Sequence, residues 1–381
     1  MRVVQHFLKW IETARVSERA AAATALAQAY LNAELAFEDR YAAEAALTAL
    51  LDDPSSKVRG ALAEALSVSR HAPMQVVAAL AADQPDVAAP ILGRSPVLLD
   101  SDLIDRVAEG RDETQRLIAM RPKLSMGVSA AIAEVGSRDA CVALVKNAGA
   151  EIAGLSFRRM VERHGADAAL REALVQDARL PPDCRHLLLV QLGEALRAAP
   201  LVQALVGAAR ADKLTRDACT RASLTLIDAI GQNEHAALVE HLRLRGDLST
   251  GFLIRMVAHG KIDFFGAVLV ALTGQGEARI RALLSGGRDM AVGALLRKAG
   301  LAPHTRAPIM RALCVWREVA RGKRVAGAQE VSWLMLHSLG ATPGQAGPAP
   351  EAAELAGLLR GIHLDVLREN ARLQAQAIAA A

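Results

Sequence analysis

The stretch DDPSSKVRGALAEAL, residues 52–66, decides the fold class of this chain. Its apolar residues stand at i, i+3, i+4, i+7 and i+8 from Val58, which places them on one face of a helix. Asp53 followed by Pro54 is typical of an N-cap with proline at the first helical position. The preceding stretch YAAEAALTALL (41–51) has the same period, so the two helices are expected to pack antiparallel across a short turn.

This helical hairpin recurs along the chain. ALLDDPSSKVRGAL (49–62) is echoed by ALAADQPDVAAPIL (79–92), and weaker echoes extend to LPPDCRHLLLVQLGEAL (180–196). A period of roughly 25 to 30 residues made of two short helices indicates an α-solenoid. The predicted fold is therefore all-α, an α-solenoid of antiparallel helical hairpins, for which we expect a right-handed superhelix.

Polar and glycine residues punctuate the predicted helices. Short polar side chains are expected to cap helix starts, at Asp100, Ser125, Ser137, Ser156, Ser249 and Asp263. Glycines are expected where helices end, at Gly110, Gly136, Gly165, Gly260, Gly274 and Gly300.

The chain is expected to have four parts. Residues 1–39 form N-terminal capping helices, 40–340 the helical repeats, 341–350 (ATPGQAGPAP) a Pro/Gly linker, and 351–381 a C-terminal helix. The apolar stripe of that last helix comprises Leu355, Leu358, Leu359, Ile362, Val366 and Leu367. We favour a cap on the last repeat, because solenoids need capped ends; the alternative is pairing with a second copy or with a partner helix.

Two stretches carry a resemblance to known families. DDPSSKVRGALAEAL is similar to HEAT-type repeats, in which an Asp–Pro turn precedes a Val-Arg helix start. The run at 76–110, VVAALAADQPDVAAPILGRSPVLLDSDLIDRVAEG, followed by IAMRPKLSMGVSAAIAEVG (118–136), resembles an uncharacterised, mainly alphaproteobacterial family, domain of unknown function 2336. The best match spans 47–300. The resemblance implies a helical-repeat fold and a cytoplasmic bacterial protein, and it transfers no catalytic residue.

Composition agrees with a folded, all-α protein. Apolar residues make up 52% of the chain, charged residues 23% and aromatic residues 3%. The four cysteines form no CxxC pair, so neither a zinc site nor a disulfide framework is expected. The longest apolar run, FFGAVLVAL (264–272), is too short to span a bilayer. We expect a soluble protein of the reducing cytoplasm.

The sequence carries no recognisable catalytic motif. His235 and His241 are too far apart to share a helix face, and no HExxH is present. Asp100, Asp102 and Asp105 cluster at a predicted helix start, where carboxylates suit the helix dipole. We therefore expect no catalytic residues, no bound metal and no cofactor.

Two sets of residues are candidates for structural or binding roles. The resemblance to HEAT-type repeats implies that Arg59 bonds Asp52, Asp53 or Asp83 and so sets the register between repeats, together with the Asp53–Pro54 turn. Residues 241–324 hold 15 Lys or Arg against 5 Asp or Glu. Candidates for contact with an anionic partner are Arg243, Arg245, Arg279, Arg281, Arg288, Arg297, Lys298, Arg321, Lys323 and Arg324.

Two hypotheses about function follow. The first is a non-enzymatic scaffold or adaptor that binds a protein or peptide on the concave surface of the solenoid. The alternative is binding of a nucleic-acid backbone, or of another anionic surface, through the basic segment 241–324. Self-association through the C-terminal helix is compatible with either.

Overall fold

The structure is a computed structural model, which describes residues 9–11, 13–339 and 350–380. Secondary structure in these residues is helical, apart from an isolated parallel bridge between Leu124 and Ala150. The predicted all-α helical-repeat class is confirmed. The chain divides into two compact units, unit 1 (Met1–Cys184) and unit 2 (Arg185–Ala381). The predicted linker, 341–350, lies outside the described residues except for Pro350.

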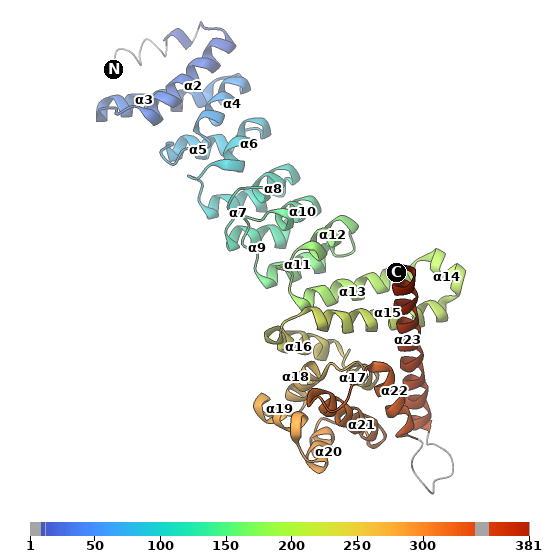
Figure 1. The fold of residues 1–381 in the computed structure, drawn as a ribbon. Coiled ribbons are helices and arrows are strands. Elements are labelled where there is room, and N and C mark those ends of the chain that lie inside the picture. Colours follow the sequence, from blue (N-terminus) through green and yellow to red (C-terminus); the bar gives the residue numbers. More distant parts are fainter. Residues whose placement is uncertain (1–8, 12, 340–349, 381) are drawn as a thin grey trace. The chain divides into compact units, whose positions relative to one another are not determined.

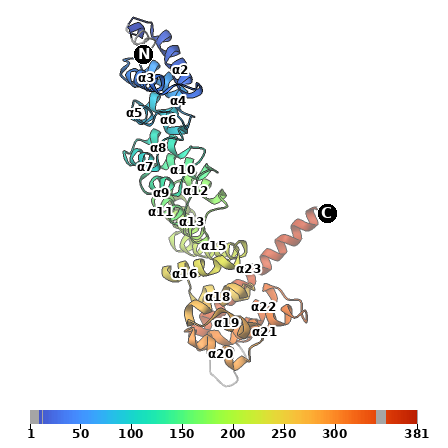
Figure 2. The same ribbon diagram turned by 90° about the vertical axis from the view of Figure 1, so that its left-hand side faces the viewer.

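Unit 1 consists of stacked helical hairpins. Its elements are α2 (Val16–Asn32), α3 (Phe37–Ala49), the 3₁₀ turn η1 (Leu50–Asp52), α4 (Ser56–Leu66), α5 (Met74–Ala81), α6 (Pro85–Arg94), α7 (Asp100–Ala108), α8 (Asp112–Ala119), α9 (Met126–Val135), α10 (Arg138–Lys146), α11 (Gly154–His164) and α12 (Ala168–Gln176). The even-numbered helices pack on one another in order, and α7, α9 and α11 do the same. Figures 1 and 2 both show the two series as separate layers. Within each layer successive helices run in the same direction.

The core of unit 1 follows from the helical period. In α4 the side chains of Val58, Leu62 and Leu66 lie four residues apart and are fully buried. Ala23 and Ala27 of α2 are equally buried and face α4, where their small side chains let the two helices approach closely.

The structure corrects the predicted start of α4. Its N-cap is Ser55, and Asp53 instead ends η1, with its carboxylate accepting a hydrogen bond of 2.8 Å from the Ser55 amide. Pro54 therefore lies in the turn before the helix. The Asp53 carboxylate is held by Nε and Nη2 of Arg19, at 2.8 and 3.1 Å, so it faces the neighbouring repeat rather than the α4 backbone.

Three of the six predicted N-caps are confirmed: the hydroxyls of Ser125, Ser137 and Ser249 each accept a bond from the amide three residues on. The others, Asp100, Ser156 and Asp263, lie inside the first turn, one to three residues beyond the N-cap. All six predicted glycines stand at helix ends; Gly110, Gly260, Gly274 and Gly300 have positive φ, and Gly136 and Gly165 are C-caps.

Arginines join successive repeats in unit 1. Arg59 of α4 donates from Nε and Nη2 to the carboxylate of Asp83, at 2.6 and 3.0 Å, and from Nη1 to the Asp53 carbonyl at 2.6 Å. The bond from Arg59 lowers the pKa of the Asp83 carboxyl and outweighs the opposing effect of burial. Burial also opposes ionisation of Asp53, but its bonds from Arg19 and Ser55 leave the pKa lowered.

Further along unit 1 the arginines bond backbone carbonyls instead. Arg121 donates to the carbonyls of Leu92 and Ser95, both at 2.5 Å, and Arg163 donates to those of Ala133 and Gly136, at 2.8 and 2.9 Å. These carbonyls lie at helix C-termini, which lack intrahelical donors and carry partial negative charge. Each guanidinium therefore ties one helix end to the following repeat.

Unit 2 has longer helices. Its elements are α13 (Pro182–Ala198), within which the division falls, α14 (Pro200–Val206), α15 (Ala208–Ala229), the 3₁₀ turn η2 (Gln232–Glu234), α16 (His235–Arg245), α17 (Thr250–Ala258), α18 (Ile262–Thr273), α19 (Glu277–Gly286), α20 (Asp289–Lys298), α21 (Pro303–Ala320), α22 (Ala328–His337) and α23 (Pro350–Ala380). Its core centres on α17 and α18, where Phe264 and Phe265 are buried.

The C-terminal helix α23 docks by its first half. Leu355, Leu359, Ile362 and Val366 are buried against α17, α21 and α22. Beyond Leu367 the described side chains are exposed, and Figure 2 shows this distal half leaving α21 and α22. The apolar stripe thus covers the end of unit 2.

Candidate functional site

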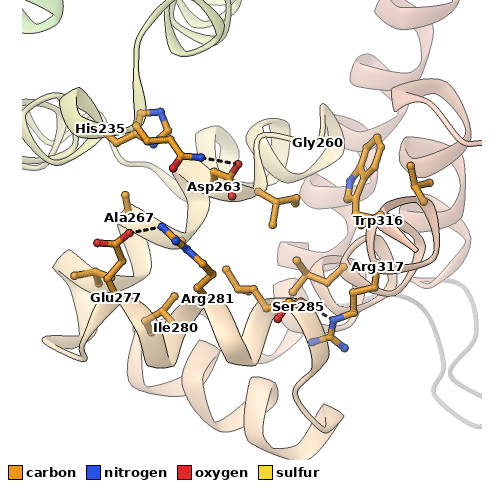
Figure 3. A pocket seen from close by; sticks show the side chains of 18 of the residues that line it. His235, Gly260, Asp263, Ala267, Glu277, Ile280, Arg281, Ser285, Trp316 and Arg317 are labelled. Carbon is orange, nitrogen blue, oxygen red and sulfur yellow. Dashed lines mark hydrogen bonds and ion pairs between the residues drawn. The ribbon is translucent and has the colours of Figure 1, made fainter. Parts of the chain in front are cut away.

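A groove with a volume of about 710 Å³ lies within unit 2, between α16, α18, α19 and α21 (Figure 3). Each helix contributes a stripe of side chains at the helical spacing of three and four residues. In α19 one stripe is Glu277, Arg281 and Ser285, and the neighbouring stripe is Ile280 and Leu284. The groove is therefore built from regular helix faces.

Small residues line one side of the groove, and at Gly266 they let α18 pack closely on α19, because a Cβ there would lie 3.4 Å from Leu284 Cδ1. α18 presents Gly266 and Ala267 to it, with Val270 one turn further along. On the opposite side Trp316 of α21 forms a wall, fixed by a 2.8 Å hydrogen bond from its indole nitrogen to the Val257 carbonyl. Gly260, with φ of +76°, packs beneath this indole; a Cβ there would lie 3.0 Å from the ring. Both the floor and this wall are rigid and largely apolar.

The rim of the groove carries charges of both signs. Arg281 pairs with Glu277 one turn away on α19, and both side chains are mostly exposed, so this pair contributes little stability and is free to exchange partners. Arg317 is largely buried and donates from Nε and Nη2 to the carbonyls of Leu284 and Leu283, both at 2.7 Å. Arg317 therefore ties α21 to α19, whereas Arg281 remains available.

Acidic and neutral groups line the other rim. Asp263 lies near the N-terminus of α18, with the amide of Gln232 3.5 Å from its carboxylate. His235 is buried edge-on against Phe264, with ring centroids 5.1 Å apart. Burial lowers the pKa of His235, opposed by the charges of Asp263 and Glu234. The imidazole is thus neutral at neutral pH, and Asp263 supplies the negative charge on this rim.

The structure disperses the predicted basic residues. Arg281 and Arg321 line the groove, and an Arg321 nitrogen donates to the Ser285 carbonyl at 3.1 Å. Three others pair with carboxylates: Arg243 with Glu240, Arg245 with Asp247, and Arg324 with Glu318 and Glu330. Within the described part of the chain, the side chains of five make no hydrogen bond or ion pair: Arg279, Arg288, Arg297, Lys298 and Lys323.

Sequence reasoning missed the groove residues Trp316, Arg317, Gly266 and Ala267. One signal was available, because Trp316 is one of only three tryptophans and its helix has too few charges for a fully solvated face. The pairing of Arg59 with Asp83, in contrast, was among the three predicted alternatives, and the structure selects it.

A second hollow, of about 790 Å³, lies between α22, α23 and residues 325–329. Several of its polar side chains already have partners: His363 Nδ1 lies 3.1 Å from the Gln329 carbonyl and 3.2 Å from the Ser332 hydroxyl, and Asn370 donates to Gln329 Oε1 at 2.8 Å. Among the residues that the structure describes, no group of three or more His, Cys, Asp or Glu is placed to hold a metal ion. The first groove is therefore the stronger candidate.

Comparison with known proteins assigns the chain to a family. Residues 87–346 match the family described as "Uncharacterised protein conserved in bacteria" (DUF2336). The chain belongs to this family. The DUF2336 match begins and ends later than the predicted 47–300; it excludes the stretch at 52–66 and includes the whole groove. No curated protein and no solved structure matches the chain.

None of the described helices alone combines the length and apolar composition needed to cross a membrane. α13 and α14 meet that criterion only when taken together, across a bend of 64°, and only by length and composition.

Proposed function

We propose that this DUF2336 protein is a non-enzymatic, cytoplasmic helical-repeat adaptor that holds a segment of a protein partner in the unit 2 groove. The observation that carries the proposal is the apolar floor of Gly266, Ala267 and Val270 beside the fixed face of Trp316. Apolar grooves between helices accept amphipathic segments, whose anchors recur at three- and four-residue spacing.

The rim charges support a further requirement on the partner. Arg281 is exposed, and its pairing with Glu277 is weak, so an incoming carboxylate competes readily for its guanidinium. Asp263 on the facing side suits a basic group of the partner. A segment with apolar anchors between an acidic and a basic residue matches the groove best.

A peptide library displayed on phage tests the proposal. Selection on the full chain should yield peptides with that pattern, and Ala267→Arg, which fills the groove floor, should weaken their binding at least ~10-fold, equivalent to about 1.4 kcal/mol. Ala282→Arg places the same side chain on an exposed position of α19 outside the groove and serves as the matched control. Fluorescence anisotropy of labelled peptides measures both affinities.

The proposal fails if no peptide is enriched, or if the selected peptides bind Ala267→Arg and Ala282→Arg equally well. Circular dichroism of each variant confirms that its helices are intact before the affinities are compared.

A second candidate function rests on the five basic side chains without partners on and around α19, α20 and α21. We propose it as the alternative: contact with the phosphate backbone of a nucleic acid. It requires that the logarithm of the association constant for duplex DNA fall linearly with the logarithm of the salt concentration, with a slope of about −0.9 for each phosphate contacted. Replacing Arg279, Arg297 and Lys298 by Gln should then make this slope less steep, by the contribution of up to about three phosphate contacts. An unchanged slope excludes this role.

A further inference from the structure

The two edges of unit 1 differ in chemistry. One edge is formed by the turns that lead from each odd-numbered helix into the next even-numbered one, and its exposed residues include Asp52, Asp86, Glu109, Arg111 and Asp139. The other, which we call the inter-repeat edge, is formed by the loops that lead from each even-numbered helix into the next odd-numbered one. Charged residues dominate the first edge.

The large exposed apolar side chains of unit 1 gather on the inter-repeat edge, beside exposed charges such as Glu38, Asp39 and Asp100. Large exposed apolar side chains stand on it at the ends of successive helices: Phe37, Tyr41, Val68, Met74, Leu99, Met120, Met126, Leu155 and Val175. Among the described residues of unit 1, the large exposed apolar side chains outside this edge are Trp10, Val16 and Val135. The asymmetry repeats through every hairpin from α3 to α12.

Local helix chemistry does not explain these residues. Phe37, Met74 and Met126 are the first residues of α3, α5 and α9, and Leu99 is the N-cap of α7. Those positions favour Ser, Thr, Asp, Asn or Pro, whose side chains satisfy or replace the free amides. Phe37 is 85% exposed and Leu155 is 79% exposed, so neither side chain contributes to the core.

The size of the edge matches a protein interface. Since a large side chain carries roughly 150–250 Å² at most, nine that are half to five-sixths exposed present on the order of 1,000 Å². Summed over the edge, that area meets the ~800 Å² that each partner contributes to a stable interface.

From this area and this pitch we infer that the inter-repeat edge of unit 1 binds the same edge of a second copy of the chain. The helices α7, α9 and α11 pack on one another in order, and stacked helices lie ~8–10 Å apart, so Leu99, Met126 and Leu155 recur at about that pitch along the edge. An identical edge turned by a two-fold axis has the same pitch, and its side chains fit between those of the first copy. Exposed charges of both signs stand on this edge, among them Glu34, Asp39, Arg40, Arg70, Lys123 and Glu151, so opposite charges are available where two copies meet.

One helix supplies a matched pair of variants. Met126 opens α9 on the inter-repeat edge and is 53% exposed, while Val135 closes α9 on the charged edge and is 49% exposed. Met126→Glu and Val135→Lys each introduce a charge that suits the dipole at that end of the helix, so both should preserve the fold.

Sedimentation velocity of the full chain from about 1 to 100 μM measures the monomer–dimer equilibrium. Wild type should dimerise. Met126→Glu should raise the dissociation constant ~100-fold, because the two-fold places two charges in the interface at about tenfold each, whereas Val135→Lys should leave it within ~2-fold. Leu155→Glu, also in a first helical turn on this edge, gives an independent reading should Met126→Glu misfold.

A wild-type chain that stays monomeric overturns the inference. So does a dimer that Met126→Glu and Leu155→Glu leave intact, which would place the contact elsewhere, for example on α23. Neither result bears on the groove, because the groove lies within unit 2 and its test compares Ala267→Arg with Ala282→Arg, both outside unit 1.

Discussion

Breaking the bond between Arg59 and Asp83 should destabilise unit 1 by a measurable and specific amount. The guanidinium meets the carboxylate in two bonds of 2.6 and 3.0 Å, and the two side chains are 16% and 17% exposed. Both residues join successive repeats, so the loss should loosen the stack rather than a single helix. We consider Arg59→Ala, Asp83→Ala and the double variant.

The magnitude follows from the geometry. Removing a hydrogen bond to a charged group costs about 1.5–3 kcal/mol, and partial solvent screening reduces the pairwise term to about 1–2 kcal/mol. Arg59→Ala also loses the 2.6 Å bond to the Asp53 carbonyl and the packing of its stem. We therefore expect about 2–3 kcal/mol for Arg59→Ala alone and a coupling energy of about 1–2 kcal/mol in the double-mutant cycle.

A second pair in the same stack provides the control. Arg94 and Glu64 also join neighbouring repeats, but their side chains are 43% and 62% exposed, so their coupling should stay below about 0.5 kcal/mol. Urea unfolding followed by circular dichroism gives the energies, and hydrogen exchange shows whether the loss is confined to unit 1. The reasoning is refuted if the Arg59–Asp83 coupling falls below about 0.5 kcal/mol or equals that of the control pair.

Two further predictions concern stability. His186 is buried, and burial together with the neighbouring charge of His241 lowers its pKa to about 4. The neutral imidazole therefore makes a contribution to the free energy of unfolding that is complete above about pH 6.5 and is lost as the pH falls through about 4. This contribution amounts to up to ~3 kcal/mol. The melting temperature should therefore fall more steeply between these pH values in wild type than in His186→Gln, and equal slopes would contradict this. Gly60→Ala has open space in α4 and should stabilise by about 0.5–1 kcal/mol. Gly149→Ala would place a Cβ 2.0 Å from the Pro122 carbonyl oxygen and should destabilise the protein by at least about 2 kcal/mol. Thermal melts in which Gly60→Ala and Gly149→Ala shift the melting temperature in the same direction would contradict this pair of predictions.

The helices could be predicted because their signals are local. The four-residue recurrence at Val58 identified α4, and Gly274 and Gly300 marked helix ends because a left-handed backbone favours glycine. Asp53 was assigned to the wrong role, because an acidic residue before proline satisfies the N-cap pattern. Its actual partner, Arg19, lies 34 residues away, a separation that a local pattern does not report.

The groove could not be predicted for the same reason. It depends on Trp316 being anchored to the Val257 carbonyl 59 residues earlier, and on Gly266 and Ala267 facing a space between three other helices. In the sequence Ala267 is indistinguishable from alanines that let helices pack closely elsewhere, such as Ala23 and Ala27. Only the tertiary arrangement separates a close contact from an open groove.

The distribution of arginine contacts bears on the choice between the two proposed functions. In an Ala- and Leu-rich stack, apolar faces fit one another in several registers, so directional bonds from Arg59, Arg121 or Arg163 specify one of them. Unit 2 uses arginine in the same way: Arg317 bonds the carbonyls of α19, and Arg255 bonds Asp217 at 3.1 Å. A basic residue that is held by a carbonyl or a carboxylate is not available to a phosphate. The excess of positive charge in 241–324 therefore overstates the surface open to an anionic partner, and this favours the apolar groove as the site of binding.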